Sequence, residues 1–288
     1  MTASEMPRPA PTRLHRETFK RGSRTYYNSS LFFPSEVRRD VFSLYGFVRV
    51  ADDFVDQVPQ DGPGLADFRR RYEDALERAA DSQRSGDAVI EAFVELALRR
   101  RFPREWTEAF FHSMELDLTK RIYITPEETL EYIHGSAEVI GLYMAKLLDL
   151  PEASFPCAKM LGRAMQYINF VRDIDEDRRL GRSYLSWHGR ADRLTDPEYA
   201  RSHEAEFQSY IEHHIGLYMG WQREAEAGFR YIRRRYLIPI KTASDMYRWT
   251  AESIRMKPLT VFERKVKPTR RRIFLRVLRN ALLDARGA

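Results

Sequence analysis

The sequence predicts an all-α protein built as one helical domain. Apolar residues recur with the spacing of amphipathic helices along most of the 288 residues, and we find no convincing strand pattern. The composition is 43% hydrophobic and 12% aromatic, which is enough to build a sizeable core. We expect about eight to ten helices, with a flexible leader at 1–18 and a single domain at 19–288.

Turn-rich and proline-containing breaks divide the first part of the chain into helices. The pair Pro34-Ser35 is typical of a helix start, and the stretch VPQDGPG at 58–64 is rich in turn residues. The stretch QRSGD and the pair Phe102-Pro103 interrupt the pattern again. Between these breaks we expect helices at 34–56, 66–80, 88–101 and 106–118.

The rest of the chain begins with a clear capping signal. Thr125 is a candidate N-cap, and Pro126 fits the first helical position, where its missing N–H is not needed. The region 199–236 is amphipathic and forms either one long helix or two. The helices predicted here are therefore 127–148, 153–176, one or two within 199–236, 244–255 and 270–285.

Composition also limits where the protein can work. The single cysteine, Cys157, excludes an internal disulfide framework and a cysteine-cluster metal site. No apolar run approaches the roughly 20 residues that a membrane span needs, and the N-terminal segment has no apolar region of a secretory signal. We therefore expect a cytoplasmic protein.

One segment is strongly basic. Residues 264–279 hold eight basic residues and no acidic one, within a chain whose formal net charge is +6. Such a run can meet an anionic membrane, phosphate or nucleic acid, or can simply be a solvated basic helix end. Because no nucleic-acid recognition motif is visible, we expect no nucleic-acid partner and predict peripheral membrane association.

Two pairs of aspartates recur at the spacing of one helical turn. Asp52 and Asp56 form the first pair, and Asp173 and Asp177 form the second. Residues four apart share a helix face, with Cβ atoms roughly 5–6 Å apart. Unpaired carboxylates so close would repel each other, so each pair needs a cationic partner. Asp53 points off this face and is expected to be a supporting or surface residue.

A bound divalent cation would neutralise the repulsion between the two carboxylates of each pair. Mg²⁺ prefers oxygen ligands and typically binds through one or two carboxylates plus substrate phosphates. Arg49 and Arg172 lie beside the two pairs and would contact the phosphate oxygens that the metal leaves free. Gln166 and Asn169 lie on or near the face of the second pair. A solvated acidic face with surface ion pairs is the simpler alternative for either pair alone.

Four stretches together carry a family resemblance. DDFVD at 52–56 resembles a DxxxD motif, and QYINFVRDIDEDRRLGRSYL at 166–185 resembles the signature Q-x-x-N-x-x-R-D-x-x-x-D with its basic continuation. SRTYY at 23–27 stands where a Ser/Thr-rich phosphate contact is expected, and YIHGSAEVIG at 132–141 resembles Y-x-x-x-V-A-G-x-V-G, with Glu138 at a glycine position. The chain thus resembles the squalene and phytoene synthases, most closely the prokaryotic phytoene synthases, over about residues 19–275.

The resemblance implies an isoprenoid synthase-type helical bundle around a central apolar cavity. It implies a Mg²⁺-dependent prenyltransferase, with Mn²⁺ as an alternative ion, that joins two geranylgeranyl diphosphates head-to-head through a cyclopropylcarbinyl (prephytoene) diphosphate to phytoene and diphosphate. The implied catalytic residues are Asp52, Asp56, Asp173, Asp177, Tyr45, Arg49 and Arg172; the substrate-binding residues are Ser23, Arg24, Tyr26, Tyr132, Gln166, Asn169, Arg182, Tyr247 and Arg264; and the metal ligands are Asp52, Asp56, Asn169, Asp173 and Asp177.

Three alternatives remain open from the sequence. A C30 synthase would use two farnesyl diphosphates and give squalene, dehydrosqualene or hydroxysqualene. A non-catalytic relative would use the same fold as an interaction protein, although such a protein has no need to keep four metal carboxylates. A nucleic-acid or anionic-surface binder would depend on the basic run. If the product is phytoene, NADPH is not expected as a cofactor. Downstream carotenoid enzymes are then candidate partners.

Overall fold

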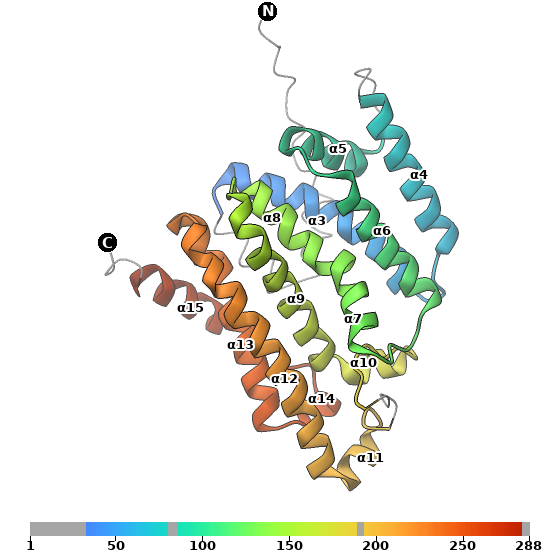
Figure 1. Cartoon of the computed structure of the whole chain (residues 1–288), viewed down its shortest axis with the longest axis vertical. Coiled ribbons are helices and arrows are strands. Elements are labelled where there is room, and N and C mark those ends of the chain that lie inside the picture. The colour runs from blue at the N-terminus through green and yellow to red at the C-terminus, as the bar shows by residue number, and fades with distance from the viewer. Residues whose placement is uncertain (1–32, 80–85, 189–192, 284–288) are drawn as a thin grey trace, which may run out of the picture. The chain divides into compact units, whose positions relative to one another are not determined.

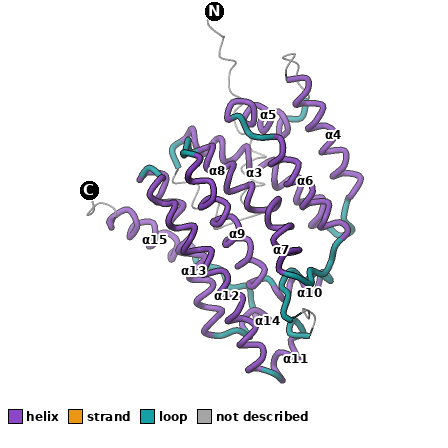
Figure 2. Tube along the Cα trace, viewed as in Figure 1, coloured by secondary structure: helices purple, strands orange, loops and turns teal. Residues whose placement is uncertain are grey.

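The computed structural model describes residues 33–79, 86–188 and 193–283 (Figure 1), and the regular elements among them are all helices (Figure 2). The one strand-like contact within these ranges is an isolated bridge between Ile122 and Ser183. The all-α prediction is therefore confirmed for this part of the chain. The chain divides into two compact units, Met1–Phe102 and Pro103–Ala288.

Three helices make up the described part of the first unit. They are α3 (Ser35–Asp56), α4 (Gly62–Arg78) and α5 (Ala88–Arg100). Helix α4 begins four residues before the predicted start, inside the turn-rich stretch. The cause is local, because the Asp61 side chain accepts a hydrogen bond from the Gly64 N–H at 2.8 Å and caps the helix.

An aromatic core fixes the orientation of α3 within this unit. Phe47 stacks on Phe93 of α5 with ring centroids 3.9 Å apart, and it meets Phe68 of α4 at 5.1 Å. All three rings are buried. Because these contacts hold one face of α3 inward, Arg49 and the aspartates of the 52–56 motif remain at least partly accessible.

The second unit holds the remaining described helices, several of them short. Its elements are α6 (Arg104–Thr119), α7 (Pro126–Ile133), the π-helix η2 (His134–Glu138), α8 (Val139–Leu147), the 3₁₀ turn η3 (Glu152–Ser154), α9 (Phe155–Arg172), α10 (Ile174–Arg179), α11 (Pro197–Ser202), α12 (Glu204–Glu226), the 3₁₀ turn η4 (Ala227–Tyr231), α13 (Arg234–Met256), α14 (Thr260–Glu263) and α15 (Arg270–Leu283). Within the described residues, no helix is both long and apolar enough to span a membrane.

Some predicted helices are confirmed with different boundaries. The expected helix 127–148 starts at a full capping box on Thr125, but a π-helical turn divides it into α7 and α8. The expected helix 153–176 is interrupted at Asp173, whose backbone (φ −103°, ψ 15°) leaves the helical region. The expected helix 244–255 is the second half of α13, which continues through Pro239 in its second turn.

Close backbone contacts pack α9 against η2 and α8. A Cβ added at Gly162 would lie 2.2 Å from the carbonyl oxygen of Ala137, so only glycine permits this approach. The contact brings Glu138 against Arg163, with its Oε1 2.6 Å from Nε, and Lys159 Nζ lies 3.3 Å away. The carboxylate that replaces a family glycine is thus buried among cations.

Candidate active site

The first acidic motif lies at the C-terminal end of α3 and is organised by one arginine. Arg49 Nη1 donates to Asp52 Oδ2 at 2.6 Å and lies 3.6 Å from Asp56 Oδ2, while its Nη2 lies 2.6 Å from Asp53 Oδ1. The helical spacing therefore brings Asp52 and Asp56 to one cation, as predicted. Asp53, expected to point away, shares the same guanidinium.

The charge of Arg49 reflects this arrangement. Burial alone would lower its pKa, but Asp52, Asp53 and Asp56 outweigh that effect and raise the pKa above its ordinary value. Tyr45, one turn earlier on α3, adds a smaller contribution in the same direction. Among the described residues, Arg49 is thus shared by the carboxylates of Asp52, Asp53 and Asp56.

The second acidic motif lies where α9 ends and α10 begins. Asp173 interrupts the helix, yet the Asp177 N–H still donates to the Asp173 carbonyl oxygen at 2.9 Å, so the two residues remain one turn apart. Arg172 grips the Asp173 carboxylate with two parallel hydrogen bonds, Nε to Oδ1 at 2.7 Å and Nη2 to Oδ2 at 2.5 Å. Such a bidentate contact fixes the carboxylate plane.

Asp177 occupies a less favourable environment. Burial raises the pKa of its carboxyl well above the ordinary value, the charge of Asp173 raises it further, and Arg182 acts in the opposite direction. Asp177 and Arg182 also line a small cavity of about 10 Å³ together with Tyr184, which is room for about one water. A cation bound by both carboxylates would remove the repulsion between them.

Lysines from a distant part of the sequence complete the cluster. Lys265 Nζ lies 3.3 Å from Asp173 Oδ1 and also pairs with Glu176 of α10. Burial lowers the pKa of Lys267, and the positive charges of Arg172 and Lys265 lower it further. Arg264, which the resemblance implies as a substrate-binding residue, is exposed and follows the last residue of α14.

Two predicted substrate residues border Arg172. Burial raises the pKa of Tyr247, whereas Arg172 and a hydrogen bond with Asn169 act to lower it, so these three side chains lie together. Asn169 Oδ1 is buried and has no hydrogen-bond partner among the described residues. Gln166, one turn earlier on α9, is partly buried. An unsatisfied buried amide oxygen is uncommon and is suited to binding a cation.

A buried aspartate that sequence analysis did not single out holds two tyrosines. Asp117, near the end of α6, accepts hydrogen bonds from Tyr132 Oη and Tyr184 Oη, each at 2.7 Å. Tyr184 stacks on Phe170 of α9 with ring centroids 4.3 Å apart. Tyr132, a predicted substrate residue, is thereby fixed next to the second motif. No local sequence pattern around Asp117 predicts these two hydrogen bonds, because their donors lie 15 and 67 residues away.

This tyrosine pair provides a stability test. We expect Tyr184→Phe to lower the free energy of unfolding by about 1.5–3 kcal/mol, because it removes a hydrogen bond to a buried charged acceptor. Tyr123→Phe is the matched control, since Tyr123 stacks on Tyr184 at 5.1 Å but its hydroxyl is buried without a hydrogen-bond partner in the described chain. The control should be neutral or stabilising. Urea denaturation measures both, and equal losses would contradict the assignment to Asp117.

The donor sets fit a divalent cation with open coordination. Within the described ranges, no three carboxylate, imidazole or thiol groups converge into a closed metal site. Each motif offers a pair of carboxylates one helical turn apart, and the second adds the unsatisfied oxygen of Asn169. Hard cations of the Mg²⁺ type are commonly held by one or two carboxylates, with phosphate and water filling the other positions. Ser23, Arg24 and Tyr26 lie outside the described residues.

Comparison with known protein families places these motifs in context. The family model described as squalene/phytoene synthase matches residues 19–272. The phytoene synthase of Rhodobacter capsulatus is 34% identical over 191 residues, which are 64% of this chain and 54% of that protein. The phytoene synthase of Pseudescherichia vulneris is 28% identical over 245 residues, or 81% of this chain and 78% of that protein.

A solved structure matches the fold over nearly the same span. A dehydrosqualene synthase crystallised in complex with ligand superposes with a TM-score of 0.76 at 21% sequence identity, covering 94% of this chain and 95% of that chain. The predicted isoprenoid synthase-type helical fold is therefore confirmed.

Proposed function

The chain belongs to the squalene/phytoene synthase family, and we propose that it is a phytoene synthase. In this proposal two geranylgeranyl diphosphates are joined head-to-head through prephytoene diphosphate, and phytoene and diphosphate are released. The observation that carries it is the second motif, where Asp173 and Asp177 lie among Arg172, Arg182 and Lys265. Carboxylates for a metal beside cations for an anion suit a diphosphate substrate.

The cofactor we propose is Mg²⁺. Asp52 and Asp56 would hold Mg²⁺ for one diphosphate on α3, and Asn169, Asp173 and Asp177 would hold Mg²⁺ for the other at the α9–α10 junction. Bound there, Mg²⁺ supplies Lewis-acid stabilisation of the leaving diphosphate. The buried, unsatisfied Oδ1 of Asn169 supports this assignment, because a ligand role would satisfy that atom.

The side chains of the second motif would bind and orient the diphosphate. Arg172 is preorganised by its bidentate contact with Asp173, and Lys265 and Lys267 add positive charge on the same side. Tyr247 keeps its proton at neutral pH because burial raises its pKa, so it can donate a hydrogen bond to a phosphate oxygen. These contacts would stabilise the charge that develops on the leaving group.

Aromatic side chains would protect the allylic cation. Tyr132 is buried, held by Asp117 and packed against Tyr184 with ring centroids 5.1 Å apart. A fixed aromatic face can stabilise a carbocation by a cation–π contact while excluding water. Tyr45 on α3 would serve the same purpose near the first motif.

We further propose that the protein works in the cytoplasm at a membrane surface. The basic segment 264–279 supports this location, because it has eight positive charges and no acidic residue. Lipid substrates and an insoluble C40 product also favour a membrane surface, where downstream carotenoid enzymes could take up the product.

The direct test offers farnesyl diphosphate and geranylgeranyl diphosphate separately, with Mg²⁺ and without NADPH, and identifies the extracted hydrocarbons by mass. We expect a C40 hydrocarbon from the C20 substrate alone and no product after EDTA treatment, with Mg²⁺ restoring turnover. Products from the C15 substrate only would overturn the phytoene assignment in favour of a C30 synthase. No product from either substrate, even with NADPH, would favour an interaction protein.

A further inference from the structure

We propose that the outer face of α15 is the docking surface through which this protein binds an anionic lipid membrane. The inference rests on the membrane location proposed above and assigns it to particular side chains. Helix α15 follows directly on the basic residues that flank the second acidic motif. This helix has two apolar faces, one buried against the protein and one exposed.

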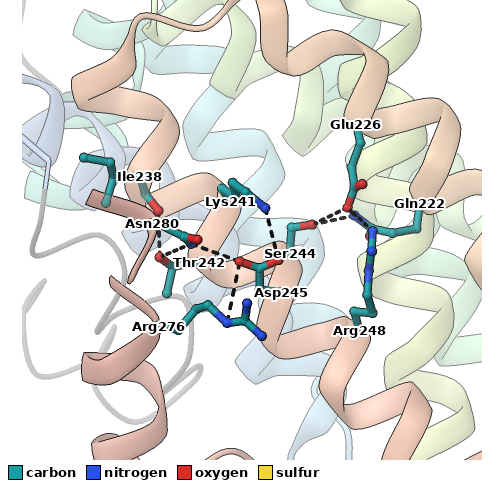
Figure 3. A network of polar contacts seen from close by, with 10 residues as sticks. All are labelled: Gln222, Glu226, Ile238, Lys241, Thr242, Ser244, Asp245, Arg248, Arg276 and Asn280. Atoms are coloured by element: carbon teal, nitrogen blue, oxygen red, sulfur yellow. Dashed lines mark hydrogen bonds and ion pairs between the residues drawn. The ribbon is translucent and has the colours of Figure 1, made fainter. Parts of the chain in front are cut away.

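The inner face of α15 is fixed against α13. Asn280 is buried, and its Nδ2 donates to Asp245 Oδ2 at 2.9 Å and to Thr242 Oγ1 at 3.1 Å (Figure 3). Ile273 and Val277 lie on the same face, one turn apart, and are also buried. The inner face is therefore already occupied by the fold.

Charged contacts prevent α15 from rotating to cover its other side. Asp245 is held between Lys241, whose Nζ lies 3.3 Å from Oδ1, and Arg276, whose Nε lies 3.8 Å from Oδ2 (Figure 3). Further along the helix, Arg234 Nη2 donates to the Ala281 carbonyl oxygen at 3.2 Å. A rotation of α15 would break these polar contacts together with the Asn280 hydrogen bonds.

The outer face presents a second apolar stripe. Phe274, Leu278 and Leu282 follow at intervals of four and are 55%, 44% and 66% exposed, and the neighbouring Leu275 is 54% exposed. These four are among the ten large apolar side chains that are exposed in the described part of the chain, and they occupy one helix of 14 residues. Apolar exposure gathered in this way marks an interaction surface, whereas scattered single residues do not.

The charge around the stripe selects the partner. Arg270, Arg271 and Arg279 are exposed on the same helix, and α15 contains no acidic residue. An apolar stripe on a helix whose charged residues are all arginines matches an anionic lipid surface, where the apolar side chains enter the acyl boundary and the guanidinium groups meet phosphates. The sequence alone showed the basic residues; the structure shows which apolar residues remain outside.

The test uses the full chain and vesicles made from equal parts of phosphatidylcholine and phosphatidylglycerol. We expect the wild-type protein to co-sediment with these vesicles at low salt but not with pure phosphatidylcholine vesicles. The double variant Phe274→Ser/Leu278→Ser should lose about tenfold or more in vesicle affinity. Leu98→Ser is the matched control, because Leu98 lies on α5 and is 52% exposed. It should bind vesicles like the wild type.

A second variant separates charge from packing. Arg271→Gln/Arg279→Gln leaves Ile273, Val277 and Asn280 in place, so it should fold normally and lose affinity for anionic vesicles only. Wild-type vesicle affinity in both double variants would overturn the proposal. So would a wild-type dimer that Phe274→Ser/Leu278→Ser converts to a monomer without changing vesicle binding, or binding to duplex DNA in place of vesicles. Vesicle binding is measured without substrate, so an inactive protein that docks through α15 would refute only the catalytic proposal.

Discussion

Asp173→Asn is expected to lower kcat by at least about a hundredfold while the helical fold is retained. Asp173 is the one carboxylate in contact with both Arg172 and Lys265 within the described residues, and in our proposal it also binds Mg²⁺. A metal contact to developing charge is worth several kcal/mol, and about 1.4 kcal/mol corresponds to a factor of ten in rate. Steady-state kinetics with the C20 substrate measures the loss, and circular dichroism checks the fold.

Asp175→Asn provides the control for the same helix. Asp175 is buried and pairs with Arg178 at 3.1 Å and with Arg179, so this variant also removes a paired carboxylate. Its partners are structural, and we expect reduced stability with kcat within about tenfold of the wild type. If the two variants lose the same activity, Asp173 has no special catalytic role and the metal assignment at α10 is wrong.

Asp52→Asn is expected to lower kcat by a similar factor at the first motif. Asp53, the next residue, provides a matched control. Asp52 and Asp53 lie at the same distance, 2.6 Å, from the two terminal nitrogens of Arg49. In our proposal Mg²⁺ is held by Asp52 and Asp56, which lie four residues apart, and Asp53 is not a ligand. We therefore predict that Asp52→Asn lowers kcat by about a hundredfold or more, whereas Asp53→Asn changes it by less than about tenfold.

A Mg²⁺ titration distinguishes metal binding from simple loss of charge. The Asp52→Asn variant should need a higher Mg²⁺ concentration for half-maximal activity, and Asp53→Asn should match the wild type. Both variants weaken the anionic environment of Arg49. An identical Mg²⁺ dependence in the two variants would show that the motif acts through Arg49 alone, without a bound metal at Asp52.

Much of the fold was predictable because its signals are local. The start of α7 at Thr125 and Pro126 and the run of α3 to Asp56 follow from capping and helical period. The π-helical turn at 134–138 was not predicted; it lies where Ala137 meets Gly162 of α9, a contact between segments that are apart in the chain. The break at Asp173 was not predicted either. Helix α4 starts earlier than predicted because Asp61, a residue of the turn-rich stretch, caps it.

The candidate site divides in the same way. The pairing of Asp52 and Asp56 at Arg49, and of Arg172 with Asp173, lies within one or two helical turns and follows from spacing. The contact of Lys265 with Asp173 joins residues that are far apart in the chain, and the hydrogen bond from Tyr184 to Asp117 spans 67 residues. No local pattern encodes such contacts.

The sequence by itself determined the helical class and the two acidic motifs, because backbone hydrogen bonds and side-chain spacing along a helix repeat every few residues. It indicated the family through the resemblance of its motifs to known signatures. Only the tertiary structure decided that Lys265 meets Asp173, that Asp117 fixes Tyr132, and that Phe274 and its neighbours on α15 stay exposed. Those features depend on which helices pack together, and packing is a property of the whole folded unit.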